Sequence, residues 1–323
     1  MSKVSIIIPI YKTEAFIEKC ARSLFEQTFK DIEYIFVNDA TPDNSISILE
    51  KVISEYPERE NNCTIVNHVV NKGLTAARNS GLAVATGEYV IHCDSDDWIH
   101  PSMIAEMYRT AITEQADAVV CDFQMVYQDK KVYYKTVDWT EDKYSSLRKY
   151  IAFEWTVLFN LLVKRTIYVD NKLSSLEGYA YCEDFNLAVK LLYHANKIVR
   201  IPHAYYCYWQ NEKSIVHNMT EKTMHDEQVM YLDAIDYFKK ENVYEFLKQP
   251  LCWRILKSKQ EWILNTQTYD KFLSLHPESH QYIWSCPYLN FKLKLMMWGV
   301  THHFSLLSRF MLLLRHLRHG KSI

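Results

Sequence analysis

The chain has 323 residues, of which 48% are hydrophobic and 14% aromatic, a composition that excludes a disordered protein and predicts one large core or two smaller ones. The formal net charge is −2, but residues 290–323 carry six lysines and arginines and no acidic residue, so the rest of the chain stands at −8. A basic end on an acidic body indicates either an anionic partner for that end or a solvated basic surface.

The cysteines bear on where the protein works. Eight of them are scattered without a CxxC pair, and several lie in apolar runs, as Cys93 and Cys121 do. This pattern favours buried, reduced thiols over a disulfide framework or a zinc site, and it predicts a reducing compartment. The N-terminal apolar run closes at Pro9 and is too short for a signal peptide or a membrane span, so we expect a cytoplasmic protein.

The segment before residue 100 alternates between strand and helix patterns. Helices are predicted to begin at Thr13 and at Thr41, where Pro42 would take the first helical position. The apolar, β-branched runs between them each predict a buried parallel strand: Val4–Ile8, Ile32–Val37, Thr64–Val69 and Tyr89–His92. Alternation at this spacing predicts an α/β fold with a doubly wound, mostly parallel sheet.

Further strand and helix patterns follow from residue 99, and beyond residue 219 the pattern is helical without a strand signal. We therefore predict a domain over 1–218 and a helical C-terminal region over 219–323. The last part of this region, 290–323, has the composition of a basic amphipathic tail.

Polar segments follow the predicted strands where such a sheet binds its ligands, beyond the carboxyl ends of the strands. They read NDATPDNS at 38–45, NKGLTAARNSGL at 71–82 and DSDDW at 94–98. The last segment places Asp94, Asp96 and Asp97 within one turn of backbone, where they repel one another unless a cation or hydrogen-bond donors compensate them. Mg²⁺ or Mn²⁺ binding a diphosphate would do so. The alternative is that Asp96 or Asp97 caps the helix that follows Pro101, and both roles are compatible.

Taken together and in order, these segments resemble glycosyltransferase family 2, which has the GT-A fold, over about residues 3–217. The resemblance is carried by VSIIIPIYKTEAFIEKCARSLFEQTF, YIFVNDATPDNS, NKGLTAARNSGLAVATGEYV and HCDSDDW, the last containing the family's DXD motif. It implies an inverting, metal-dependent hexosyltransferase of the bacterial surface-polysaccharide type. Residues 1–98 would form the nucleotide-binding half of the domain and 99–218 the acceptor-side half.

The resemblance also implies the substrates and their site. The donor would be a nucleotide diphosphate sugar such as a UDP-hexose, and the acceptor a hydroxyl of a saccharide or a lipid-linked saccharide. Asp39 would accept the ring N–H of uracil, and Arg78 would position the diphosphate. The implied nucleotide-sugar site consists of Pro9, Tyr11, Asp39, Arg78, Asp94 and Ser95.

For the metal, Mn²⁺ or Mg²⁺, the resemblance implies Asp96 as the main ligand, with Asp94 and His217 as further ligands. The segment EGYAYCEDFNLAVKLL at 177–192 resembles the family's ED motif, in which the second acid is the general base. Asp184 would then take the proton of the acceptor hydroxyl, with Glu183 supporting it. Acids in the first turn of a helix are also ordinary partners of the helix dipole, which is the alternative.

Two other classes of function remain open. A nucleotidyltransferase would also bind phosphates through a metal, but it would need a glycine-rich loop after the first strand, and no glycine precedes Gly73. The same absence argues against a dinucleotide-binding fold or a P-loop. A non-catalytic protein that binds nucleotide sugars or saccharides on the same fold is the other alternative. We expect no nucleic-acid partner.

The tail 290–323 combines large apolar residues with only basic charges, which is typical of an interfacial helix on anionic lipid. Lys294, His302, His303 and Arg309 interrupt the apolar run, which argues against a membrane span. We therefore expect peripheral binding at the inner face of the plasma membrane. In the alternative, the tail packs against the catalytic domain through Leu295, Trp298, Phe304, Leu307 and Met311.

Overall fold

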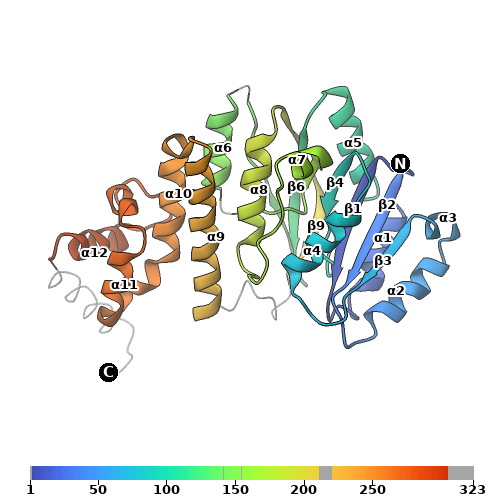
Figure 1. Cartoon of the computed structure of the whole chain (residues 1–323), viewed down its shortest axis with the longest axis horizontal. Helices are drawn as coiled ribbons and strands as arrows, with labels where there is room; N and C mark the ends of the chain where they lie inside the picture. The colour runs from blue at the N-terminus through green and yellow to red at the C-terminus, as the bar shows by residue number, and fades with distance from the viewer. Residues whose placement is uncertain (1, 141, 154, 211–219, 305–323) are drawn as a thin grey trace. The chain divides into compact units, whose positions relative to one another are not determined.

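The computed structural model of the chain describes residues 2–140, 142–153, 155–210 and 220–304. Two compact units are present, Met1–Asp226 and Glu227–Ile323. The predicted boundary between 218 and 219 lies outside the described residues and stays a prediction. The first unit holds the sheet, and the described part of the second is helical, as predicted (Figure 1).

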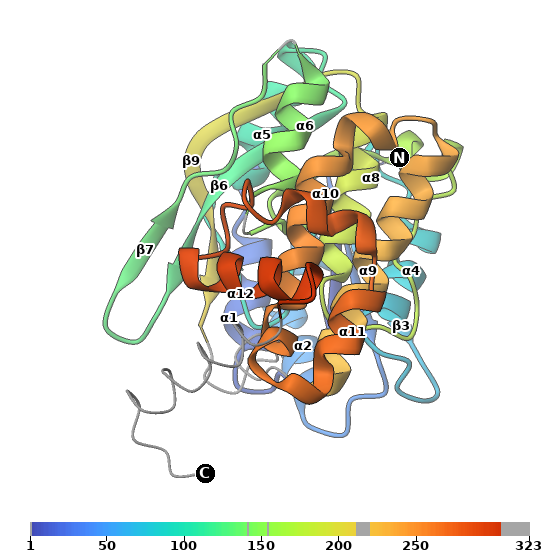
Figure 2. The same ribbon diagram turned by 90° about the vertical axis from the view of Figure 1, so that its left-hand side faces the viewer.

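The N-terminal unit is built on a nine-stranded sheet with the order β3-β2-β1-β4-β8-β6-β9-β5. The ninth strand, β7, pairs with β6, and Figure 2 shows these two strands side by side. The strands are β1 (Val4–Ile10), β2 (Ile32–Asn38), β3 (Cys63–Asn67), β4 (Tyr89–His92), β5 (Trp98–Ile99), β6 (Ala118–Val126), β7 (Lys131–Tyr134), β8 (Leu161–Lys164) and β9 (Ile198–Trp209). Strands β3, β2, β1 and β4 run parallel, and β8 lies antiparallel between β4 and β6. The predicted α/β sheet is confirmed.

Helices cover the sheet of the N-terminal unit and make up most of the C-terminal unit (Figure 1). In sequence order the first helices are α1 (Ile17–Phe25), α2 (Ser45–Ser54), α3 (Pro57–Glu60), α4 (Leu74–Val84), α5 (Met103–Thr113), α6 (Lys143–Ile151), α7 (Arg165–Asp170), α8 (Glu183–His194) and α9 (Glu221–Lys240). They are followed by α10 (Tyr244–Ser258), η2 (Gln260–Leu264), η3 (Thr266–Thr268), α11 (Tyr269–Ser274), η4 (Pro277–Tyr282) and α12 (Phe291–Thr301).

Strand β1 is buried along its whole length because helices cover both of its faces. Its residues Val4, Ile6, Ile8 and Ile10 join one hydrophobic core with apolar side chains of α1, α2 and α5. On the opposite face α4 approaches very closely, since a Cβ at Gly81 would come within 2.5 Å of Ile7 Cγ2. This contact holds α4, and with it Arg78, against the carboxyl end of the strand.

Strand β3 departs from the prediction of a buried strand. It pairs only with β2 and forms the edge of the sheet, so its residues are partly or fully exposed. Val69, the last residue of the predicted strand, lies beyond its end and is 95% exposed. The apolar run correctly indicated a strand. Its burial would have required a second neighbouring strand, which β3 lacks in the described sheet.

Both helices predicted to start at a threonine begin later. Thr13 O accepts the N–H groups of Phe16 and Ile17 in a turn before α1, which starts at Ile17. The Thr41 hydroxyl accepts the Lys12 N–H at 2.8 Å and donates to Asp43 at 2.6 Å, so it ties two loops together. Helix α2 consequently starts at Ser45.

All eight cysteines are free thiols, as predicted. Six are buried, while Cys63 and Cys182 are partly exposed. Among the helices that the structure describes, none combines the length and the apolar character that crossing a membrane requires.

Candidate active site

At the carboxyl edge of the sheet, Asp39 binds the loop that leads into α4. Its Oδ1 accepts from His68 Nδ1 and from the Lys72 N–H, both at 2.7 Å, and its Oδ2 accepts from the Gly73 N–H at 2.8 Å. Gly73 has φ +90°, in the left-handed region that favours glycine. A carboxylate offers about four acceptor positions. Asp39, which is buried, therefore keeps one position for a further donor such as a base N–H.

His68 links Asp39 to helix α4, a role that the sequence did not predict. Its Nε2 lies 2.8 Å from Ser80 Oγ, while Nδ1 faces Asp39. With Nδ1–H donating to the carboxylate, Nε2 accepts from the Ser80 hydroxyl, and the ring is held at both ends. A histidine just after a strand gave no sequence signal for this contact, because its partners come from elsewhere in the chain.

The other two residues predicted to line the nucleobase site differ in exposure. Tyr11 follows β1 and is 41% exposed, with Lys12 Nζ 5.2 Å from its ring centroid. Pro9 is buried within β1, where it lies opposite Val37 of β2. Only Tyr11 of this pair offers a ring face to a ligand.

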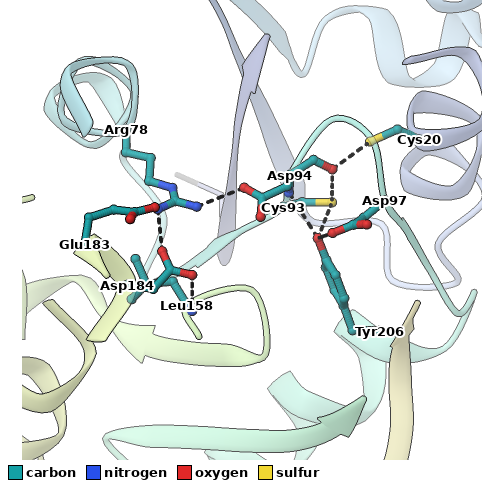
Figure 3. A network of polar contacts seen from close by, with 9 residues as sticks. All are labelled: Cys20, Arg78, Cys93, Asp94, Asp97, Leu158, Glu183, Asp184 and Tyr206. Atoms are coloured by element: carbon teal, nitrogen blue, oxygen red, sulfur yellow. Dashed lines mark hydrogen bonds and ion pairs between the residues drawn. The ribbon is translucent and has the colours of Figure 1, made fainter. Parts of the chain in front are cut away.

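The centre of the site is the guanidinium of Arg78, which binds acids from two distant motifs (Figure 3). Nη2 contacts Asp94 Oδ1 at 2.9 Å, and Nη1 contacts Glu183 Oε1 at 3.1 Å and Asp184 Oδ1 at 2.5 Å. The Arg78 side chain is only 2% exposed. The structure thus brings together the predicted catalytic pair and one residue of the DSDD segment.

One guanidinium does not neutralise three carboxylates, and burial makes the excess negative charge costly. Burial, with the neighbouring Asp184 charge as the next cause, raises the pKa of Glu183 to about 8. Burial also raises the pKa of Asp184, although the Arg78 charge opposes this shift. Near neutral pH this site therefore favours a protonated Glu183, while at Asp184 the charge of Arg78 favours the carboxylate.

Helix α8 begins at Glu183, as the sequence predicted, and Leu187, Leu191 and Leu192 are buried. Asp184 is also fixed from another side, since its Oδ2 accepts the Leu158 N–H at 3.3 Å. The acids of the first turn thus bind a cation outside their own helix, which goes beyond an interaction with the helix dipole.

The acids of the DSDD segment have different surroundings. Asp97 is buried and accepts from the Tyr206 hydroxyl and from the Trp209 N–H, both at 2.7 Å. The alternative that Asp96 or Asp97 caps the following helix is wrong, because α5 begins at Met103 with Ser102 at its N-cap. The chain first forms β5, which pairs with β9 and draws Asp97 toward that strand.

Asp96 and the buried Ser95 complete the segment. Burial and the Asp94 charge raise the pKa of Asp96 to about 6, and the one hydrogen-bond donor that opposes the shift is its own backbone N–H. A carboxylate left so poorly compensated fits a hard cation that would supply the missing positive charge.

Among the described residues, no three histidine, cysteine, aspartate or glutamate side chains converge to hold a metal ion. Mg²⁺-type sites commonly use one or two carboxylates together with substrate phosphates, so Asp96 with Asp94 fits such a site. The predicted third ligand, His217, lies outside the described residues.

Tyr206 has a hydrogen-bonding role in the site that was not predicted from the sequence. It is buried in β9, its hydroxyl donates to Asp97, and its oxygen accepts the Asp94 N–H at 3.1 Å (Figure 3). A buried tyrosine hydroxyl usually has a polar partner, which is the only signal that could have been read from the sequence. Tyr206 therefore holds both the backbone of the DSDD segment, at Asp94, and one of its side chains, Asp97.

Comparison with known proteins identifies the family of the chain. The model of glycosyl transferase family 2 matches residues 5–165. A curated relative, the uncharacterized glycosyltransferase EpsJ of Bacillus subtilis, is 31% identical over 223 residues, which are 66% of this chain and 62% of EpsJ. The chain thus spans less than two thirds of that relative. The poly(ribitol-phosphate) beta-glucosyltransferase of Bacillus spizizenii is 36% identical over 118 residues, or 36% of this chain and 18% of that enzyme.

Among solved structures, S. aureus TarS 1-349 in complex with UDP-GlcNAc has the same fold, with a TM-score of 0.69. The match has 20% sequence identity and covers 99% of this chain and 92% of the TarS chain.

Proposed function

Because the chain belongs to glycosyltransferase family 2, we propose that it transfers a hexose from a nucleotide diphosphate sugar, a UDP-sugar in the first instance, to a hydroxyl of a saccharide or lipid-linked saccharide. Surface-polysaccharide assembly is the process that we infer. Two relatives support this direction: one is named a poly(ribitol-phosphate) beta-glucosyltransferase, and TarS was solved with UDP-GlcNAc. An enzyme with a lipid-linked acceptor would work at the inner face of the plasma membrane.

The observation that carries the proposal is the cluster around Arg78. Asp94 lies 16 residues from Arg78, and Asp184 lies 106 residues from it, yet both bind its guanidinium. Clusters of acids with shifted pKa values are typical of catalytic sites. Here the cluster joins the segment expected to bind the donor to the segment expected to activate the acceptor.

We assign proton transfer to Asp184. A hydroxyl is a poor nucleophile until a base takes its proton, and a carboxylate with a raised pKa is a stronger base than an ordinary one. The acceptor oxygen would attack the anomeric carbon from the face opposite the nucleotide, so the configuration inverts. Glu183, which retains its proton near neutral pH, would lower the local negative charge and leave Asp184 as the base.

For donor binding, we assign the nucleobase to the remaining acceptor position of Asp39 and to the exposed ring of Tyr11. The contacts of Arg78 with three acids support a positioning role for it, in which it holds Asp94 and Asp184 in place. Its predicted contact with the diphosphate stays a prediction, as do the roles of Pro9 and Ser95.

Asp96, with Asp94 beside it, would hold Mn²⁺ or Mg²⁺, and such an ion supplies positive charge to the departing diphosphate. The poorly compensated carboxylate of Asp96 supports this assignment.

The test is donor consumption by the purified full-length chain. It would be incubated separately with UDP-glucose, UDP-galactose, UDP-GlcNAc and GDP-mannose, with Mn²⁺ or with EDTA, and the nucleoside diphosphate released would be measured. We expect slow hydrolysis of one donor with Mn²⁺. Binding without hydrolysis, or without transfer to any saccharide offered, would favour the non-catalytic alternative. Release of pyrophosphate from a nucleoside triphosphate and a sugar phosphate would identify a nucleotidyltransferase.

A further inference from the structure

Helix α12 in the C-terminal unit is apolar on both of its faces. Met296, Met297 and Val300 are buried in the core of this unit, together with residues of α10, η2 and α11. The opposite face carries Phe291 and, seven residues later, Trp298, a spacing that places both on one side of a helix. Phe291 is 69% exposed and Trp298 partly exposed, so this second apolar face is not part of the core.

Neighbouring rings extend this face into what we call the aromatic strip, composed of Trp284, Phe291, Trp298 and Phe304. The rings of Trp284 and Phe291 lie 6.1 Å apart, and those of Trp298 and Phe304 stack at 5.9 Å. Trp284 and Phe304 are 48% and 60% exposed. Large aromatic side chains that are exposed and close together often mark an interaction surface.

The charge carried by the sequence after Glu278 has one sign. Glu278 is the last acidic residue of the chain, so every formally charged side chain after it is basic. On α12 these are Lys292, which is exposed, and Lys294, whose Nζ donates to Trp284 O at 2.9 Å. Lys294 thus contacts the backbone of Trp284, a residue of the strip.

One alternative drawn from the sequence stays a prediction. Leu295, Trp298 and Phe304 were candidates for packing the tail helix onto the catalytic domain, and the structure shows only that Met296, Met297 and Val300 pack α12 into the core of its own unit. Leu307 and Met311 lie outside the described residues.

We propose that the aromatic strip binds the interfacial region of an anionic lipid bilayer. Tryptophan and phenylalanine rings together with lysines, on a segment whose own sequence carries no acidic residue, are the composition of helices that lie in this region. The lysines would meet the negative headgroups, and the rings would enter the boundary between headgroups and acyl chains. The proposal does not depend on the enzymatic reaction or on the tail beyond residue 304.

The experiment is co-sedimentation of the purified full-length chain with two kinds of vesicle. One is phosphatidylcholine alone, and the other is phosphatidylcholine mixed with phosphatidylglycerol. We expect binding to the mixed vesicles that weakens as salt is added, and little binding to phosphatidylcholine. The double variant Phe291→Ser/Phe304→Ser should reduce the partition constant about tenfold or more, since two apolar rings no longer leave water.

A matched control is Phe246→Ser on α10, which alters an aromatic residue of the same unit that is 65% exposed but lies off the strip. A second pair of variants tests the contribution of charge. Lys292→Glu should weaken binding to the mixed vesicles, whereas Lys240→Glu, on α9, should leave it unchanged. Thermal melting would verify that all variants stay folded, which is expected because the altered side chains are exposed.

The proposal is overturned if the wild-type chain binds both kinds of vesicle equally weakly. It is also overturned if the wild-type chain binds but the strip variant binds as well as the Phe246→Ser control. In that second case the lipid contact belongs to another part of the chain.

Discussion

At the scale of single residues, the single positive charge of Arg78 faces three carboxyl groups. Arg78 meets Asp94, Glu183 and Asp184 in a buried setting, so its charge cannot keep all of them ionised. The guanidinium stays charged in proteins, and the balance is therefore set by protonation of the acids. Burial raises the pKa of Glu183 to about 8, whereas at Asp184 the charge of Arg78 opposes the rise. The two adjacent acids thus have different surroundings, which is the condition for assigning them different roles.

Replacing Asp184 with asparagine should preserve donor binding and reduce turnover. Asparagine keeps the shape of the side chain and cannot accept the proton, so Asp184→Asn should lower kcat by roughly 10² or more while donor affinity changes only a few-fold. Steady-state kinetics together with calorimetric titration of the donor would measure both. Glu183→Gln mimics the protonated acid and should cost much less. Near-normal turnover of Asp184→Asn, or a larger loss in Glu183→Gln, would rule out Asp184 as the base.

Asp96 should make nucleotide binding depend on both metal and pH. Its pKa is raised to about 6, so above this pH the carboxylate is available to a metal, and below it a proton competes. The affinity for UDP with Mn²⁺ should fall as the pH is lowered through about 6, while UDP binding in EDTA should change little. Asp96→Ala should remove the Mn²⁺ enhancement at all pH values. Calorimetry that shows the same enhancement in this variant would exclude Asp96 as the ligand.

At the scale of elements, a short helix fixes the end of a longer one. Arg59 on α3 is buried, and it donates to the carbonyls of Phe25, Gln27, Phe29 and Lys30 at 2.6–3.2 Å. Phe25 is the last residue of α1, and the carbonyls at a helix end lack partners within the helix. The fork of the guanidinium reaches several of them together, which a lysine ammonium would do less well.

Replacing Arg59 should destabilise the N-terminal unit through these carbonyls. Arg59→Met would leave buried acceptors without donors, and we expect a loss of about 3 kcal/mol in the free energy of unfolding, with Arg59→Lys in between. Urea denaturation would measure the change. Arg109→Met is the control, since Arg109 is 66% exposed and a surface change typically costs about 0.5 kcal/mol or less. If Arg59→Met were no more destabilising than this control, the carbonyl contacts would not account for the fold of α3.

At the scale of the whole molecule, buried cations are satisfied in two ways. Arg78 binds acids, whereas Lys259 in the C-terminal unit, like Arg59 in the N-terminal unit, is buried and donates to backbone carbonyls, those of Phe272 and Leu275 at 3.1 and 2.7 Å. His280 Nε2 lies 2.9 Å from the same Nζ. Burial lowers the pKa of Lys259 from 10.5 to about 7, because no carboxylate stabilises its charge.

The stability of the C-terminal unit should therefore rise with pH. In the unfolded chain Lys259 binds a proton below about 10.5, but in the folded chain only below about 7, so between these values the unfolded state holds more protons. The slope should approach ~1.4 kcal/mol per pH unit within that window. Amide hydrogen exchange of α10 and α11, corrected for the intrinsic rate at each pH, would report it.

Lys259→Met should flatten this dependence, while Lys271→Met, which alters an exposed lysine of α11, should retain it. Equal slopes in the wild-type chain and in Lys259→Met would contradict a lowered pKa at Lys259.

The sequence by itself determined the features that depend on short stretches of chain: the parallel strands β1, β2 and β4, the start of α8 at Glu183, and the polar segments at the strand ends. Each follows from apolar periodicity, helix-start chemistry or the order of motifs, which neighbouring residues specify. The family resemblance rested on the same local segments and is confirmed by the family match over 5–165.

Only the tertiary structure decided which of these segments meet. The convergence of Asp94, Glu183 and Asp184 on Arg78 depends on α4 packing closely on β1 at Gly81, and no local pattern encodes that contact. The same holds for Asp97, which binds β9 instead of capping a helix, and for β3, whose place at the sheet edge leaves an apolar run exposed. Local propensity fixes what a segment can form, whereas burial, charge matching and pKa values depend on neighbours brought from far along the chain.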